Sequence, residues 1–281
     1  MEIATWQDYL ADKSAGEHTV SGDLKIFKDL YSPQLDNHRD VLVYIPADYE
    51  TGAAHYPVIY MHDGQNLFDA HTSFAGEWQV DETLLALEQD GIAAIVVGLA
   101  NIGPERLNEY SPFHNARLGG GKGAAYLDFI VQTVKPLIDS QFRTRPDRDH
   151  TGIIGSSMGG LISLYGFFSQ PQTFGFAGVL SPALWFADRA IFPYIRQQSY
   201  QPGRVYIDMG TAEYPVKSWR KLVPTRIYNP SCADTRRLYA DLKHKGYQPD
   251  RDIRYVEDAG AGHNEAAWAR RLPDALRFLL R

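Results

Sequence analysis

Residues 155 to 159 read Gly-x-Ser-x-Gly and follow the apolar run Thr151–Ile154, with a second apolar stretch directly behind them. In this motif a serine occupies a sharp turn between a strand and a helix, where its hydroxyl is exposed as a nucleophile. Ser157 fits that position, whereas a frame centred on Ser156 would put bulky residues where the glycines belong. The pattern therefore predicts nucleophilic catalysis by Ser157. The alternative is a serine that only caps the following helix.

A serine nucleophile needs a histidine base, which a carboxylate must orient. In the strand-turn-helix version of this chemistry the chain order is serine, acid, histidine, and only His244 and His263 follow Ser157. His244 lies in a charged segment before a glycine, so we expect it to face solvent at a helix end. His263 follows the strand-like run 253–256 and ends the glycine-broken loop 260–263. We predict that His263 is the base.

The acid is expected just after a later strand. The run Val205–Met209 is strand-like, and Glu213 stands a few residues beyond it, where a side chain can reach back over the sheet. Asp208 lies inside the strand pattern, so its side chain should project onto a face of the sheet. We therefore prefer Glu213, with Asp208, Asp234 and Asp258 as alternatives.

An oxyanion hole is the remaining requirement, because fixed N–H donors must stabilise the charge that develops on the carbonyl oxygen. One donor is expected to be the backbone N–H of Met158, which follows the nucleophile. The second should come from the loop after an early strand, read here as Tyr56–Met61. Gly64 in that loop permits close backbone approach, which makes the N–H of Gln65 the candidate.

His62 and Asp63 begin the same loop and are residue types that bind metals. No H-E-x-x-H or paired-cysteine pattern accompanies them. We predict a hydrogen-bonded structural turn for both, and a reaction that uses neither a metal nor a cofactor.

Several strings along the chain together carry a family resemblance: Met61 to Asp69, Gly76-Glu77-Trp78, Val80-Asp81-Glu82, Arg106, Glu109 to Phe113, the Gly155 to Gly159 motif, Ser181 to Trp185, Gly210 to Glu213, Gly262 to Glu265, and Trp268. By these strings the chain resembles the esterase D-like and enterobactin esterase-like branch of the α/β-hydrolases, which is related to the feruloyl esterases and mycolyltransferases. The resemblance runs from about residue 40 to the end and implies a catalytic triad of Ser157, Glu213 and His263.

Composition fits an ordinary enzyme that acts on small molecules. The 281 residues are 44% hydrophobic and 22% charged, with a formal net charge of -6, which argues against nucleic acid or anionic membranes as partners. The single cysteine, Cys232, excludes an intrachain disulfide. The N-terminus has neither a basic nor an apolar leader region, so we expect a cytoplasmic location. The oligomeric state is left open.

Strand-like and helix-like segments alternate along the chain, which predicts a mainly parallel sheet covered on both faces. We expect the α/β-hydrolase fold in a single domain, 1–281, with two antiparallel strands first. Expected strands are 18–28, 40–45, 58–61, 92–97, 151–154, 174–180, 205–209 and 253–256; expected helices are 80–89, 124–141, 235–245 and 263–280. Pro136 should kink its helix or be accommodated where a hydrogen bond is missing.

Substrate recognition should come from loops at the strand ends. Arg106, in the long loop Leu99–Lys122, either binds an acidic or polyhydroxyl substrate group or forms a surface ion pair with Glu109. Trp185 and Phe186 either form an aromatic wall of the site or close the core. Residues 214–229 form either a lid or a surface loop.

These residues predict a serine esterase that hydrolyses a small-molecule carboxylic ester through an acyl-enzyme. An acyltransferase using the same triad is the first alternative, because the covalent intermediate can pass its acyl group to an alcohol. A binding protein of hydrolase fold without turnover is the second.

Overall fold

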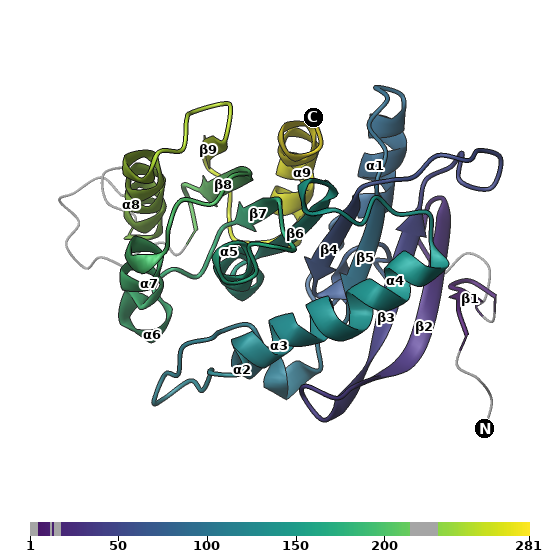
Figure 1. The fold of residues 1–281 in the computed structure, drawn as a ribbon, viewed down its shortest axis with the longest axis horizontal. Coiled ribbons are helices and arrows are strands. Elements are labelled where there is room, and N and C mark those ends of the chain that lie inside the picture. Colours follow the sequence, from purple (N-terminus) through teal and green to yellow (C-terminus); the bar gives the residue numbers. More distant parts are fainter. Residues whose placement is uncertain (1–4, 12, 14–17, 214–229) are drawn as a thin grey trace.

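The computed structural model describes residues 5–11, 13, 18–213 and 230–281, and the predicted lid lies outside them. All nine described strands form one sheet in the order β1-β2-β3-β5-β4-β6-β7-β8-β9 (Figure 1). Within the described chain, no helix is long and apolar enough to cross a membrane.

One end of the sheet is antiparallel, as predicted. Strands β1 (Gln7–Asp8), β2 (Asp23–Ser32) and β3 (Asn37–Ile45) pair in turn, and β3 also pairs antiparallel with β5 (Ile95–Leu99). The second of these begins at Asp23, five residues later than the expected His18.

The rest of the sheet is parallel and positions the chemistry. Because parallel strands all end at the same edge, the loops that follow them converge there. Ser157, Glu213 and His263 all follow strands of this half. After β5 the order is β4 (Val58–His62), β6 (Thr151–Ser156), β7 (Phe176–Leu180), β8 (Arg204–Gly210) and β9 (Ile253–Asp258).

Helices cover both faces of the sheet (Figure 1). One face packs against α3 (Gly123–Phe129), α4 (Lys135–Gln141), α5 (Met158–Ser169), α7 (Ile191–Gln197) and α8 (Pro230–Lys245). The other packs against α1 (Val80–Glu88) and α9 (Glu265–Leu279). Two apolar cores therefore sandwich the sheet, and the predicted α/β-hydrolase architecture is confirmed.

The structure adds detail that the hydrophobic pattern lacks. A wider helical turn, Ile130–Val134, separates α3 from α4 and ends two residues before Pro136, so a changed hydrogen-bond pattern accommodates the proline. Helix α9 begins at Glu265 rather than at His263, because the Asn264 side chain caps it by accepting from the N–H of Ala267. Short helices also appear in the connections: η1 (Gly64–Asn66), η2 (Gly103–Glu105), α2 (Arg106–Glu109), η4 (Arg148–His150) and α6 (Phe186–Arg189).

Candidate active site

Ser157 lies at the turn between β6 and α5 in a backbone conformation that non-glycine residues rarely adopt, with φ 56° and ψ -119°. Such strain persists only where the surroundings enforce it, and it is common at functional sites. The turn is held by hydrogen bonds from the Ser157 N–H to the Leu180 carbonyl (3.0 Å) and from the Ala183 N–H to the Ser157 carbonyl (2.9 Å). The Ser157 side chain forms no capping bond to the described first turn of α5, so the helix-cap alternative finds no support.

The glycines around Ser157 differ in how much they are needed. A Cβ on Gly155 would lie 2.6 Å from the His62 ring and 2.8 Å from the Gly159 backbone. A Cβ on Gly159 would approach nothing closer than 3.4 Å, whereas one on Gly160 would lie 2.9 Å from the Leu180 carbonyl oxygen. The crowding that excludes side chains therefore acts at Gly155 and Gly160.

His263 and Glu213 form a direct pair. The Nδ1 of His263 lies 2.8 Å from the Oε2 of Glu213, whose carboxylate is fully buried, while the histidine side chain is 21% exposed. With Nδ1–H donating to the carboxylate, Nε2 carries the lone pair that a general base needs. The His263 ring also packs edge-on against Trp268, with ring centroids 5.0 Å apart.

The second carboxylate oxygen of Glu213 is fixed by separate donors. Its Oε1 accepts hydrogen bonds from the Ser181 hydroxyl (2.5 Å) and from the Gly210 N–H (2.7 Å). The competing acids have other partners: Asp208 and Asp258 bind Arg271, and Asp234 binds Arg189. His244 is exposed near the end of α8, as predicted, and its ring contacts the carbonyl of Ala240. Of the four candidate acids, Glu213 is thus the one that contacts His263.

Arg271, which the sequence reasoning missed, lies beneath this pair. It is 5% exposed, and its Nε and Nη2 donate to the Asp208 carboxylate at 2.8 and 3.1 Å. Its Nη2 also donates to the Ser181 hydroxyl at 2.9 Å, as does the Trp268 indole. Burial raises the pKa of Asp208 to about 6, although Arg271 acts in the opposite direction. Arg271 and Ser181 therefore connect the buried Asp208 to Glu213.

Replacing Arg271 by Met should destabilise the fold by about 3–5 kcal/mol, because it leaves the Asp208 charge buried without its partner. Arg270→Met is the matched control. Arg270 is exposed and pairs with Asp258 at the surface, so the control should cost no more than about 1 kcal/mol. Urea unfolding measures both variants, and equal losses would contradict the account.

The predicted oxyanion loop follows β4. Asp63 has a positive φ of 56°, and the short helix η1 comes next. A Cβ on Gly64 would lie 2.7 Å from the backbone of Gly98 in β5, so only glycine fits there. Gln65 is held by its side chain, which accepts from the N–H of Asn101 (3.1 Å), and by its carbonyl, which accepts from the Thr72 hydroxyl (2.8 Å). This loop and the first N–H groups of α5 lie after adjacent strands, β4 and β6.

Asp63 forms a partly buried ion pair with Arg106, and this corrects one sequence-based alternative. The Nε and Nη2 of Arg106 donate to its two oxygens at 2.7 and 2.8 Å, and Asn101 adds a third bond at 2.7 Å. Burial alone would raise the pKa of Asp63, but the bonds and charge of Arg106 outweigh burial and lower it. The surface pair of Arg106 with Glu109 does not form, because Glu109 is buried against Arg39 at 2.9 Å.

His62 is hydrogen-bonded, as predicted, but it is the last residue of β4 rather than part of a turn. Its ring contacts the Tyr126 hydroxyl (2.8 Å) through Nδ1 and the Ser163 hydroxyl (3.1 Å) through Nε2. The Ser163 hydroxyl already donates to the Gly159 carbonyl (2.8 Å), so it must accept from Nε2–H, and Nδ1 must accept from Tyr126. Burial lowers the pKa of His62 to about 3. His62 is therefore neutral and connects β4 to α5 through its hydrogen bond with Ser163.

Acid should therefore destabilise the protein through His62. Its pKa rises from about 3 in the folded state to 6.5 on unfolding, so the unfolded state binds the extra proton between these values. Stability is full above pH 6.5 and falls as the pH drops, by up to about 1.4 kcal/mol per unit. Urea unfolding at pH 7.5, 6 and 5 should show a steeper loss for the natural chain than for His62→Gln. Parallel pH profiles would contradict this role.

The two aromatic residues predicted near the site differ in exposure. Trp185 is 42% exposed and packs beside Phe186, which is buried. Trp185 is therefore available to a ligand, whereas Phe186 belongs to the core. The glycine run 119–121 is a turn of positive-φ residues, anchored by the Asn108 side chain, which accepts from the N–H of Gly120 at 2.8 Å.

A family model described as "Putative esterase" matches residues 32–279. The chain belongs to this esterase family. It is a carboxylic ester hydrolase, as the sequence predicted. The esterase is 30% identical over 251 residues to the uncharacterized protein YbbA of Bacillus subtilis. This alignment covers 86% of the present chain and 92% of YbbA. It is also 28% identical over 144 residues to the siderophore triacetylfusarinine C esterase of Aspergillus fumigatus, about half of each chain.

Solved structures share the fold of this esterase. The siderophore hydrolase EstA of Aspergillus nidulans superposes with a TM-score of 0.72 at 20% identity, over 92% of this chain and 94% of that one. The enterobactin esterase of Shigella flexneri gives a TM-score of 0.68 at 20% identity, over 92% of this chain and 59% of that one. Both likenesses show the α/β-hydrolase fold.

Proposed function

We propose that residues 1–281 act as one catalytic domain, a serine esterase with Ser157 as nucleophile, His263 as general base and Glu213 as the acid that orients it. The observation that carries the proposal is the His263–Glu213 pair, 2.8 Å apart, after β9 and β8. It belongs to the same sheet edge as the strained turn of Ser157 after β6. A nucleophile, a base and a buried acid at one edge are the parts that acyl transfer needs.

The proposed reaction has two steps. The Ser157 hydroxyl attacks the ester carbonyl while His263 Nε2 takes its proton, and the alcohol leaves with that proton. Glu213 keeps the proton of His263 on Nδ1 and stabilises the imidazolium. The backbone N–H groups of Gln65 and Met158 bind the oxyanion. Water then attacks the acyl-enzyme by the same route and releases the acid, so no cofactor takes part.

Arg106 and Trp185 are the proposed substrate contacts. Arg106 is bound to Asp63 beside the oxyanion loop and keeps 27% of its side chain exposed. The Arg106–Asp63 pair carries no net charge. The remaining N–H donors of Arg106 therefore suit hydroxyl and carbonyl groups of a substrate better than free anions. Two relatives are named as siderophore esterases, one for triacetylfusarinine C and one for enterobactin. We propose a polar, oxygen-rich ester as the natural substrate.

Hydrolysis of p-nitrophenyl esters of graded acyl length tests the proposal. An acyl-enzyme mechanism predicts a rapid burst of p-nitrophenol, one per active site, where deacylation is slow. Methanol added as an acceptor separates the alternatives: an acyltransferase yields mainly the methyl ester, and an esterase yields mainly the free acid. A chain that releases no p-nitrophenol from any ester and resists serine-directed phosphonates would instead be a binding protein.

A further inference from the structure

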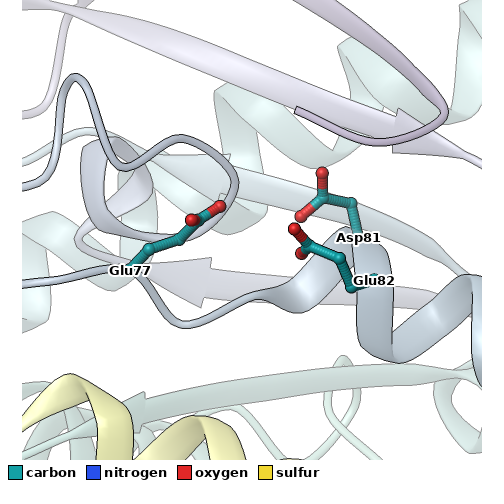
Figure 2. A group of neighbouring side chains, drawn as sticks. All are labelled: Glu77, Asp81 and Glu82. Atoms are coloured by element: carbon teal, nitrogen blue, oxygen red, sulfur yellow. The ribbon is translucent and has the colours of Figure 1, made fainter. Parts of the chain in front are cut away.

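Three carboxylates converge at the start of α1, away from the proposed triad. Glu77, Asp81 and Glu82 each offer an oxygen, and these oxygens all lie within 4.8 Å of one another. Figure 2 shows the Asp81 and Glu82 carboxylates pointing toward one another, with the Glu77 carboxylate directed at them from the preceding loop. The resemblance singled out these residues, but the proposed esterase reaction gives them no role.

One oxygen of each carboxylate is buried and has no hydrogen-bond donor among the described residues: Glu77 Oε1, Asp81 Oδ1 and Glu82 Oε2. Asp81 is the decisive residue, because it is 0% exposed, its carboxylate points toward that of Glu82, and its Oδ1 has no donor among the described residues. A buried carboxylate oxygen without a donor carries the full cost of desolvation. An ion bound between the three groups would remove that cost.

The charges of the cluster are not balanced within the described part of the chain. No ion pair with Lys, Arg or His is found there for any of the three carboxylates. Among the described residues, the donors to the other oxygens of Asp81 and Glu77 are neutral: the Ser21 N–H (2.6 Å) and the Thr19 hydroxyl (3.0 Å).

We propose that Glu77, Asp81 and Glu82 bind one divalent cation, and that Ca²⁺ fits best. Hard cations prefer carboxylate oxygens. Two oxygens on one Ca²⁺, each at about 2.3–2.6 Å, lie at most about 5 Å apart, and the three oxygens meet that limit. Mg²⁺ demands shorter bonds and near-ideal octahedral geometry. Asp81 and Glu82 lie in the first turn of α1, and Glu77 lies on the loop before it. The ion would therefore fix the junction between this loop and α1.

The junction is connected to two other segments. Thr19 and Ser21 of the N-terminal segment bind Glu77 and Asp81 directly. The N–H of Trp78, next to Glu77, donates to the carbonyl of Asn66 at 2.9 Å, within η1. A bound cation would therefore stabilise the N-terminal segment and the predicted oxyanion loop together, without taking part in the reaction.

Thermal unfolding of the EDTA-treated, dialysed full chain tests the site. Saturating Ca²⁺ should raise the Tm by roughly 3–8 °C, as expected for ligand at about 100 times its Kd, and Mg²⁺ should raise it less. Tb³⁺, a calcium substitute, should give luminescence excited through tryptophan that Ca²⁺ displaces. Glu82→Gln should abolish the Tm rise and the displaceable luminescence. Asp90→Asn makes an equal charge change at an exposed residue just after α1. This control should preserve the Tm rise and the displaceable luminescence.

Two results would overturn the proposal. One is a natural chain whose Tm ignores Ca²⁺ and which gives no displaceable Tb³⁺ signal; the carboxylates would then share a proton, and Tm would follow pH alone. The other is a Ca²⁺ response that Glu82→Gln retains in full. If Glu82→Gln fails to fold, Glu77→Gln, on the loop before α1, takes its place; it should abolish the same two signals, and a full Ca²⁺ response in Glu77→Gln would likewise overturn the proposal.

Discussion

Replacement of Ser157 by Ala is expected to lower kcat for p-nitrophenyl ester hydrolysis by about 10⁴- to 10⁶-fold. The methyl group cannot form the acyl-enzyme, so only the oxyanion donors and substrate binding remain. Folding should be unaffected, because the Ser157 side chain makes no cap bond to the described part of α5. Steady-state kinetics and circular dichroism of the purified variant measure the two quantities.

The matched control is Ser156→Ala, one residue earlier. Ser156 is the last residue of β6 and is 4% exposed, so its hydroxyl is not placed for attack. The control should retain kcat within a few-fold. If Ser156→Ala lost activity and Ser157→Ala kept it, the proposed frame of the motif would be wrong.

Glu213→Gln should lower kcat by about 10⁴-fold while KM changes little. The amide keeps the shape of the carboxylate, but its NH₂ group can donate to His263 Nδ1 and favour the tautomer whose Nε2 carries the proton. That tautomer cannot accept a proton from Ser157. The amide also removes the charge that stabilises the imidazolium. Kinetics with one ester at several concentrations separate kcat from KM.

Asp234→Asn is the control for this prediction, because Asp234 was a competing acid and the structure pairs it with Arg189 instead. It should leave kcat within a few-fold of the natural chain. A large loss in Asp234→Asn with a small one in Glu213→Gln would contradict the assignment of the acid.

The sequence predicted the sheet class and the residues that the structure brings to one edge, because those signals are local. A strand, a glycine-flanked serine and a helix occupy neighbouring positions around Ser157, and loop glycines mark His263. The preference for Glu213 over Asp208 rested on the two-residue periodicity of a strand. The expected placement of Asp208 on a face of the sheet is observed, since its side chain binds Arg271 of α9.

The groups that support the site could not be predicted in the same way. Arg271 contacts Ser181 and Asp208 across 90 and 63 residues, and no local pattern indicates such pairs. In an amphipathic helix, Arg271 has the appearance of an ordinary surface residue. Arg106 shows the same limitation, because its neighbour Glu109 suggested a local ion pair, whereas packing placed Asp63 opposite it.

The most direct test of the central claim is mass spectrometry of the esterase after reaction with a fluorophosphonate. The account predicts one phosphonyl adduct per chain, located by peptide mapping on Ser157, with formation slowed strongly by His263→Ala. An adduct on another residue, or labelling at an unchanged rate in His263→Ala, would contradict the proposed nucleophile and its base.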